Sequence, residues 1–206
     1  MIGGALLMLS ALATAFAAQP ESMPAEHPNL QRISVQTEGS GTDVILIPGL
    51  ASSREVWSNL ASLLQSSHRV HLIELAGFAS TPAISHPDGK IIAPTADAIA
   101  EYIHTQHMKA PVIIGHSLGG EVALMLGARH PDEVGPLMIV DALPFYTLMI
   151  YPAATSKTAS QRASATRDWL LAQSPAQFTA FQKTSITRLA KTEAVRPALV
   201  AAGISS

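Results

Sequence analysis

Gly115, Ser117 and Gly119 have the types and spacing that nucleophilic catalysis by a serine hydroxyl requires. An apolar run at 112–114 precedes them, and a run with helical spacing at 121–126 follows. A serine on a sharp turn between a strand and a helix exposes its hydroxyl, and small residues two positions away let the two backbones approach. The helix directs its first N–H groups and its positive dipole end at a developing oxyanion. The stretch therefore predicts a nucleophile elbow with Ser117 as the nucleophile.

Two other interpretations of this glycine-rich turn compete with the elbow. A phosphate-binding loop also joins a strand to a helix, but it is longer and carries a lysine after its last glycine. Here Glu121 follows Gly120, and the loop is too short. A turn without chemistry is the other interpretation. The strand pattern before the serine and the helical pattern after it favour the elbow.

The rest of the chain alternates strand-like and helix-like segments. We expect strands at 32–37, 43–47, 69–75, 112–114 and 137–140, and helices at 56–64, 93–108 and from the elbow to 129. Such alternation predicts an α/β fold with a mostly parallel sheet and helices on both faces. Ligand sites in these sheets lie at the carboxyl ends of the strands, where Leu50, Ala76, Ser117 and Asp141 would converge.

The character of the chain changes after Pro144. No strand-like run follows, and helices are expected at 164–173, 175–190 and 192–202. We interpret 146–206 as a helical cap inserted into the core. The residues at the junction of the core and this cap are apolar and are consistent either with a substrate entrance or with ordinary packing: Phe145, Tyr146, Met149 and Tyr151.

Composition limits the possible functions. The chain has 206 residues with 48% hydrophobic and 14% charged content, which suits one sizeable globular domain. A net charge of −2 and the lack of a basic run argue against a nucleic-acid partner. The absence of cysteine excludes a thiol nucleophile, a disulfide framework and a thiolate metal site. No metal-ligand spacing is evident, so we expect neither a metal nor a cofactor.

The first residues predict export. Residues 1–18 are small and apolar, and Ala15-Phe16-Ala17 matches a signal-peptide cleavage site, although no Lys or Arg precedes the apolar run. The run is short for a membrane span. We therefore expect a signal peptide at 1–18, a linker at 19–31, the catalytic core at 32–145, and a periplasmic or secreted protein. An N-terminal helix of the fold and an uncleaved membrane anchor are the alternatives.

Together these motifs resemble the α/β-hydrolase superfamily, from about residue 32 to the end. The resemblance rests on Leu46–Leu50 after one strand, on Gly115–Gly120, and on Asp141–Pro144 before a helical segment. It implies a serine that attacks an acyl carbonyl of a small ester-like substrate. It also implies an oxyanion hole from the backbone N–H of Leu118 and that of Leu50 or its neighbour Ala51. The elbow itself would comprise Gly115, His116, Ser117, Gly119 and Gly120.

This sequence departs from the pattern of that superfamily in the catalytic acid and the general base. The family order is serine, acid and histidine, with the last two after the cap, whereas this sequence reaches Ser206 within the cap. The histidines all precede residue 131: His27, His68, His71, His86, His104, His107, His116 and His130. His116 adjoins Ser117 but points in a different direction at an elbow, and His86 lies in a loop. Asp141 is a candidate acid or a loop-capping aspartate. We expect a C-terminally truncated hydrolase.

Three functions remain open at this point. The first is a serine esterase or lipase-like hydrolase, with acid and histidine beyond Ser206. The second is an inactive fragment or non-catalytic binding protein of the same fold. The third is a membrane-anchored interaction protein held by residues 1–18. The sequence predicts neither the oligomeric state nor the substrate, because the cap that sets specificity is incomplete.

Overall fold

The computed structural model describes residues 28–206 except 80, 85–89, 146, 190–191 and 205–206. The predicted signal peptide, most of the predicted linker, His27 and His86 lie outside the described residues. None of the described helices is long and apolar enough to cross a membrane.

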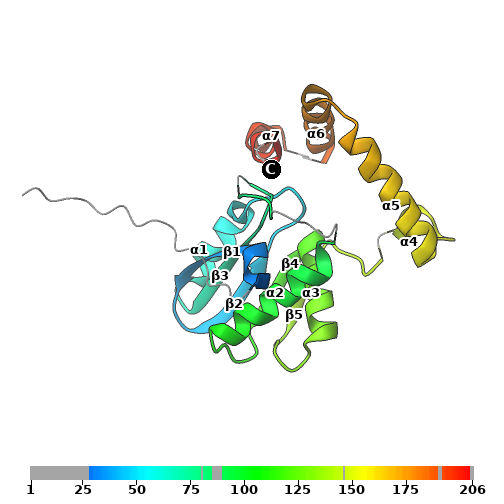
Figure 1. Cartoon of the computed structure of the whole chain (residues 1–206). Coiled ribbons are helices and arrows are strands. Elements are labelled where there is room, and N and C mark those ends of the chain that lie inside the picture. Colours follow the sequence, from blue (N-terminus) through cyan, green and yellow to red (C-terminus); the bar gives the residue numbers. More distant parts are fainter. Residues whose placement is uncertain (1–27, 80, 85–89, 146, 190–191, 205–206) are drawn as a thin grey trace, which may run out of the picture.

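A five-stranded sheet forms the centre of the fold (Figure 1). Its strands are β1 (Ile33–Gly39), β2 (Thr42–Ile47), β3 (His68–Leu75), β4 (Val112–His116) and β5 (Leu137–Val140). They lie in the order β1-β3-β2-β4-β5. β1 pairs antiparallel with β3, and all other pairs are parallel. The predicted mostly parallel sheet is confirmed, and β5 has the predicted bounds.

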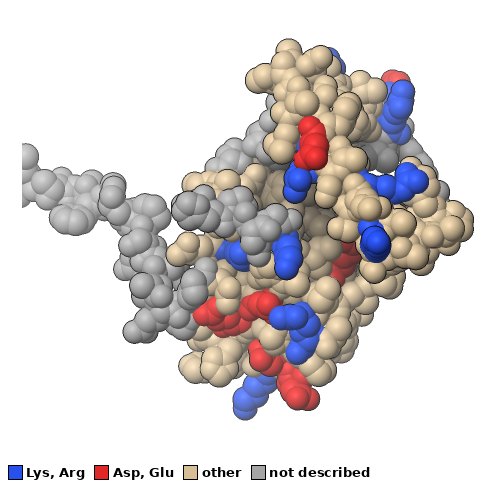
Figure 2. Space-filling view, turned by 45° about the vertical axis from the view of Figure 1, so that its right-hand side comes forward, with Lys and Arg blue, Asp and Glu red and all other residues tan. Residues whose placement is uncertain are grey.

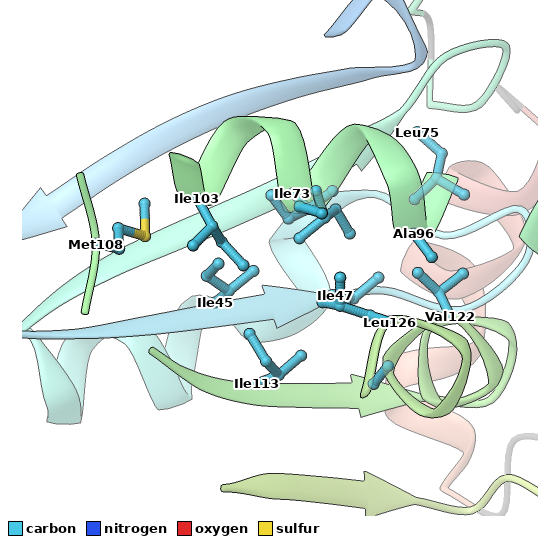
Figure 3. Packing of buried hydrophobic residues seen from close by; sticks show 13 residues of the cluster. Ile45, Ile47, Ile73, Leu75, Ala96, Ile103, Met108, Ile113, Val122 and Leu126 are labelled. Atoms are coloured by element: carbon cyan, nitrogen blue, oxygen red, sulfur yellow. The ribbon is translucent and has the colours of Figure 1, made fainter. Parts of the chain in front are cut away.

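Helices cover both faces of this sheet, as the sequence predicts. On one face α2 (Ile92–Thr105) and α3 (Leu118–Arg129) pack on alternate residues of the strands, among them Ile45, Ile73 and Ile113 (Figure 3). On the other face α1 (Ser58–Leu64) covers the intervening residues, including Leu46 and Val70. Burial of both faces explains why the parallel strands are continuous apolar runs rather than alternating ones.

Two short 3-10 helices shift the expected boundaries. Pro28–Arg32 forms η1, with Leu30 buried, so the last residues of the predicted linker belong to the packed core. Arg54–Trp57 forms η2 ahead of α1, and the Ser53 hydroxyl caps it by accepting a hydrogen bond from the Glu55 N–H. The predicted helix at 56–64 is therefore a 3-10 turn followed by a shorter α-helix.

The region after residue 146 is helical, as predicted, but its first long helix starts earlier. It contains α4 (Thr147–Ile150), α5 (Ser156–Leu171), α6 (Pro175–Leu189), η3 (Glu193–Val195) and α7 (Arg196–Ile204). α5 starts eight residues before the predicted 164, because a Thr155–Thr158 capping box fixes its first turn. The first turns of α5 are polar and exposed, so they lack the apolar spacing on which the prediction depended. Figure 1 shows helices α4 to α7 grouped to one side of the core.

Candidate active site

Ser117 lies on the sharp turn between β4 and α3. Its φ is +51° and its ψ is −120°, a strained conformation for a residue with a Cβ. The surrounding backbone fixes this conformation. The Ser117 N–H donates to the Val140 carbonyl at 3.0 Å, and the Ser117 carbonyl accepts from the N–H groups of Gly120 at 2.8 Å and Glu121 at 3.1 Å. The strain is therefore held by β5 on one side and the first turn of α3 on the other.

The glycines of the elbow allow backbones to meet where no side chain fits. A Cβ on Gly115 would lie 2.1 Å from the Gly119 carbonyl oxygen. A Cβ on Gly119 would lie 2.3 Å from the carbonyl oxygen of Ile47 and 2.5 Å from that of Pro48. The first turn of α3 thus rests directly on the end of β2. This contact explains why the spacing of small residues around Ser117 carries structural information.

Two backbone segments border the serine where an oxyanion would form. Leu118 is the first residue of α3, and N–H groups at that position have no acceptor within their own helix. The loop after β2 lies opposite, because the Cβ position of Gly49 is 3.3 Å from the Cβ of Ser117. Leu50 follows in this loop with an exposed side chain, and Ala51 has a φ of +53°. The structure thus brings the Leu118 and Leu50 segments together at Ser117.

Asp141 follows β5 at the same edge of the sheet. The Ser117 N–H bonds to the preceding residue, Val140, so the backbone of Asp141 directly follows this contact. Its φ of +48° makes it a second strained position beside the serine. The carboxylate is exposed and has no hydrogen-bond or ion-pair partner within the described part of the chain. Asp141 is therefore close to the elbow in the fold, but nothing orients its side chain.

No histidine of the described residues forms a hydrogen bond with Ser117. His116 lies against the loop after β2, with its Nδ1 3.2 Å from the Cβ position of Gly49. The Nε2 of His130 lies 2.9 Å from the Asp97 carboxylate, and the Nδ1 of His68 is hydrogen-bonded with the Ser67 hydroxyl. His104 and His107 are exposed. The described residues also contain no group of three His, Asp or Glu side chains that could hold a metal ion.

The sequence analysis missed a polar network at the opposite end of the strands. His71 of β3 is buried, and its Nε2 lies 2.9 Å from the Asp43 carboxylate while its Nδ1 lies 2.9 Å from the Tyr102 hydroxyl. Arg69 binds both oxygens of Asp43, at 2.5 and 3.1 Å. The signal that could have revealed this network is the presence of Asp43, Arg69 and His71 inside otherwise apolar strands. Because Asp43 lies at the start of β2 and Ser117 follows the end of β4, this histidine is not a base for the serine.

This network predicts that stability falls on acidification. Burial lowers the pKa of His71 although its hydrogen bond to the Asp43 carboxylate opposes this shift, and the hydrogen bond that Asp43 accepts from Arg69 lowers the pKa of Asp43. The unfolded chain therefore binds more protons, first below the ordinary histidine pKa of about 6.5 and then below about 3.9 for aspartate. For His71, a full proton of difference gives a slope of about 1.4 kcal/mol per pH unit.

Urea unfolding between pH 7.5 and 5 measures this slope. We expect the His71→Gln variant, which retains polar groups but does not titrate, to have a flatter profile than the natural chain. The exposed His104 of α2 provides the matched control, and His104→Gln should keep the natural slope. Equal slopes for all three proteins would contradict a buried neutral His71.

The fold and the elbow define an α/β protein with a strained serine between the interior strand β4 and helix α3. Residues 43–200 match the sequence profile of the alpha/beta hydrolase fold family. The chain therefore belongs to the alpha/beta hydrolase fold family.

Two relatives that this chain matches in sequence are named as esterases. The chain is 30% identical over 149 residues to a pimeloyl-[acyl-carrier protein] methyl ester esterase of Chromobacterium violaceum, a match that covers 72% of this chain and 56% of the relative. The esterase of the same name from Photobacterium profundum is 34% identical over 112 residues, covering 53% of this chain and 40% of the relative. The matched part of the chain thus spans 56% of the length of the first relative and 40% of the length of the second.

Solved structures show the same fold at lower identity. A carboxylesterase structure from Nitrososphaera gargenis superposes with a TM-score of 0.65 at 18% identity, covering 84% of this chain and 63% of that chain. A marine microorganism esterase gives a TM-score of 0.57 at 24% identity, covering 82% and 63%. In both, more than a third of the solved chain has no counterpart in the matched part of this sequence.

Proposed function

We propose that this protein is, or is part of, a serine hydrolase that cleaves carboxylic esters with Ser117 as its nucleophile. The observation that carries the proposal is the strained backbone of Ser117 at the first turn of α3, with the loop after β2 beside it. Unfavourable conformations of this kind persist at functional sites, where the surrounding structure maintains them. The relatives named for methyl ester hydrolysis support an ester as the substrate class.

The reaction would proceed through an acyl-serine. The Ser117 hydroxyl oxygen attacks the ester carbonyl carbon while its proton passes to a general base, and the N–H groups of Leu118 and Leu50 stabilise the oxyanion. Collapse of the tetrahedral intermediate expels the alcohol, which takes up the proton. Water, deprotonated by the same base, then attacks the acyl-serine, releases the carboxylic acid and restores Ser117.

The general base that this reaction needs is not provided by a described histidine, because none of them hydrogen-bonds to Ser117. A serine hydroxyl without an adjacent base is a weak nucleophile. We propose that a histidine on a segment following Ser206 supplies it, in the order that the family resemblance implies. Asp141 is the candidate acid within this chain, since it lies at the same sheet edge as Ser117.

A non-catalytic binding protein of the same fold is the second candidate. The observation that favours it is that no histidine of the described residues hydrogen-bonds to Ser117. Under this alternative the elbow is retained as a structural turn, and its serine is no more reactive than an ordinary serine.

Reaction with a fluorophosphonate, followed by peptide mapping, separates these two functions. Our proposal expects stoichiometric modification of Ser117 once the base is present, and none in a Ser117→Ala variant. The purified 206-residue chain should be compared with the chain extended after Ser206 by the proposed histidine-bearing segment. A folded, extended protein that remains unmodified at Ser117 would establish the binding protein instead.

We also propose export through residues 1–18, which rests on the sequence alone. Cleavage after the Ala15-Phe16-Ala17 motif would shorten the mature chain, and its intact mass in the periplasm or medium measures this directly. An unshortened mass would favour the alternatives of an anchor or an N-terminal helix.

A further inference from the structure

The side chains of the sheet face under α2 change from apolar to polar near one end of the strands. Val35 and Ile73 are partners in the register of β1 with β3, and Thr37 and His71 form the next pair on the same face. Tyr102 of α2 packs against His71, with the two ring centroids 5.7 Å apart in an edge-to-face arrangement. Residues of two strands and one helix therefore meet in one polar cluster at that end.

A cavity of about 350 Å³ adjoins Tyr102, between η1, β1 and α2. Its size lies within the range of small-molecule sites, roughly 300–1,000 Å³. The walls include the apolar residues Leu30, Ile33 and Val35, and none of the described residues that line the cavity is charged. Two strands, β3 and β2, separate β1 from β4, so this cavity is not the site at Ser117.

Most polar groups around this cavity are already bonded or lie at its rim. The Thr105 hydroxyl donates to the Tyr102 carbonyl at 2.9 Å. The Ser34 hydroxyl binds Arg54, on the opposite face of β1 from the apolar wall residues. Gln106 is exposed where α2 ends. Among the residues that line the cavity, Tyr102 therefore has the hydroxyl that can recognise a ligand between apolar walls.

The hydrogen bond between Tyr102 and His71 has a fixed direction. The Nε2 of His71 lies 2.9 Å from the Asp43 carboxylate, which can only accept, so Nε2 carries a proton. Burial lowers the pKa of His71 and keeps its imidazole neutral near pH 7, which leaves Nδ1 as an acceptor. The Tyr102 hydroxyl, 2.9 Å from Nδ1, therefore donates to it, and the Thr37 hydroxyl is farther away, at 3.3 Å. Toward a further partner, the Tyr102 oxygen acts only as an acceptor.

We propose that this cavity binds a small, uncharged, mostly apolar molecule through a hydroxyl group that donates a hydrogen bond to the Tyr102 oxygen. Aliphatic alcohols are the chemical class that meets these conditions. The uncharged, largely apolar lining excludes a carboxylate or an ammonium group, because burial of an unpaired charge is costly. A carbonyl or ether oxygen has only lone pairs and would face the lone pairs of Tyr102. The proposal concerns this cavity only, and it holds or fails independently of the role of Ser117.

Two isomers that differ in their hydrogen-bond donor test this recognition. The first, 1-hexanol, has a hydroxyl, whereas 1-methoxypentane has the same atoms and no donor. Each is titrated at neutral pH into the isotope-labelled natural chain, and the shifts of backbone amide signals give the affinity. We expect 1-hexanol to bind about fivefold more tightly, as one net hydrogen bond provides, and to shift the amides of Val35 and Gln106. The amides of Thr158 and Arg162, which line a cavity at the start of α5, should not shift.

Replacement of Tyr102 by phenylalanine removes the acceptor and keeps the aromatic ring that lines the cavity. In a folded Tyr102→Phe variant, the two isomers should bind with equal affinity. Tyr151→Phe is the matched control, since Tyr151 lies against Arg162 outside the proposed cavity, and this variant should keep the preference for 1-hexanol. The amide spectrum of each variant verifies that it is folded.

The natural chain alone can overturn the proposal, whether or not Tyr102→Phe folds. Equal affinities for the two isomers, or no binding of 1-hexanol, would do so. Shifts that omit Val35 and Gln106 would place the alcohol elsewhere and would also contradict it. Hexanoate that binds as tightly as 1-hexanol would show that the lining does not exclude charge. A folded Tyr102→Phe variant that retains the preference would show that the phenol oxygen is not the acceptor.

Discussion

Substitution of Gly119 by alanine is expected to destabilise the fold severely, by about 3 kcal/mol or more. The added methyl group would lie 2.3 Å from the Ile47 carbonyl oxygen and 2.5 Å from that of Pro48. Both obstacles are backbone atoms of a buried strand end, so neither can rotate away. The first turn of α3 would have to separate from β2, and Ser117 would move with it. Chemical unfolding of Gly119→Ala against the natural chain measures this cost.

Gly127 provides a matched control in the same helix. A Cβ there would meet only the Leu137 side chain, with Cδ1 at 2.7 Å and Cγ at 3.8 Å, and this side chain is rotatable and partly exposed. Alanine at an interior helix position gains up to about 1 kcal/mol over glycine. Gly127→Ala should therefore be neutral or stabilising. If both variants unfold at the same denaturant concentration as the natural chain, the close approach at Gly119 is not a structural requirement.

The elbow was predictable because its constraint is local. Sharp turns and close backbone contacts require particular residue types at fixed spacing. Gly115, Ser117 and Gly119 occupy the turn as expected. The strands were predictable for a similar reason, since burial on both faces leaves uninterrupted apolar runs such as Leu137–Val140. Here the local pattern and the tertiary environment impose the same requirement on the sequence.

Features that depend on distant partners were not predictable. Asp43, His71 and Tyr102 are separated by 28 and 31 positions, and only the pairing of β2 with β3 and the packing of α2 bring them together. The start of α5 was missed because its exposed face carries no apolar period. The antiparallel pairing of β1 was also unspecified, since an alternating strand fits either direction at a sheet edge.

Charge is distributed over the surface without a dominant sign on the face that Figure 2 shows. Acidic and basic groups are interspersed there. The informative charges are instead the few that are buried, because a buried charge is costly unless it is paired. Glu74 of β3 is one of these, and its location beside the loop after β2 links it to the candidate active site.

Replacement of Arg54 by methionine is expected to cost about 3 kcal/mol, the order found when a buried pair loses one partner. Glu74 is 6% exposed, and one of its carboxylate oxygens accepts hydrogen bonds from the Arg54 Nε at 2.7 Å and from the Arg54 backbone N–H at 3.1 Å. Arg54 also binds the Ser34 hydroxyl. The variant would leave the carboxylate with the single backbone donor. Thermal and chemical unfolding at neutral pH measure the loss.

Two further variants separate pairing from general damage. Arg167 and Asp168 form an exposed pair, 63% and 65% accessible, and Arg167→Met should change stability by less than about 0.5 kcal/mol. Arg54→Met combined with Glu74→Leu removes both charges and should recover much of the loss. If the double variant is no more stable than Arg54→Met, the unpaired carboxylate is not the cause.

The Arg54 prediction also bears on the loop after β2. Gly49 lies beside Ser117 at one end of this loop, and Arg54 binds Glu74 at the other end, so Leu50 lies between two positioned points. An oxyanion donor must be held in place before the reaction begins. Arg54→Met should therefore slow phosphonate labelling of Ser117 more than Arg167→Met does, wherever labelling is observed. Equal labelling rates would show that the loop is positioned without Arg54.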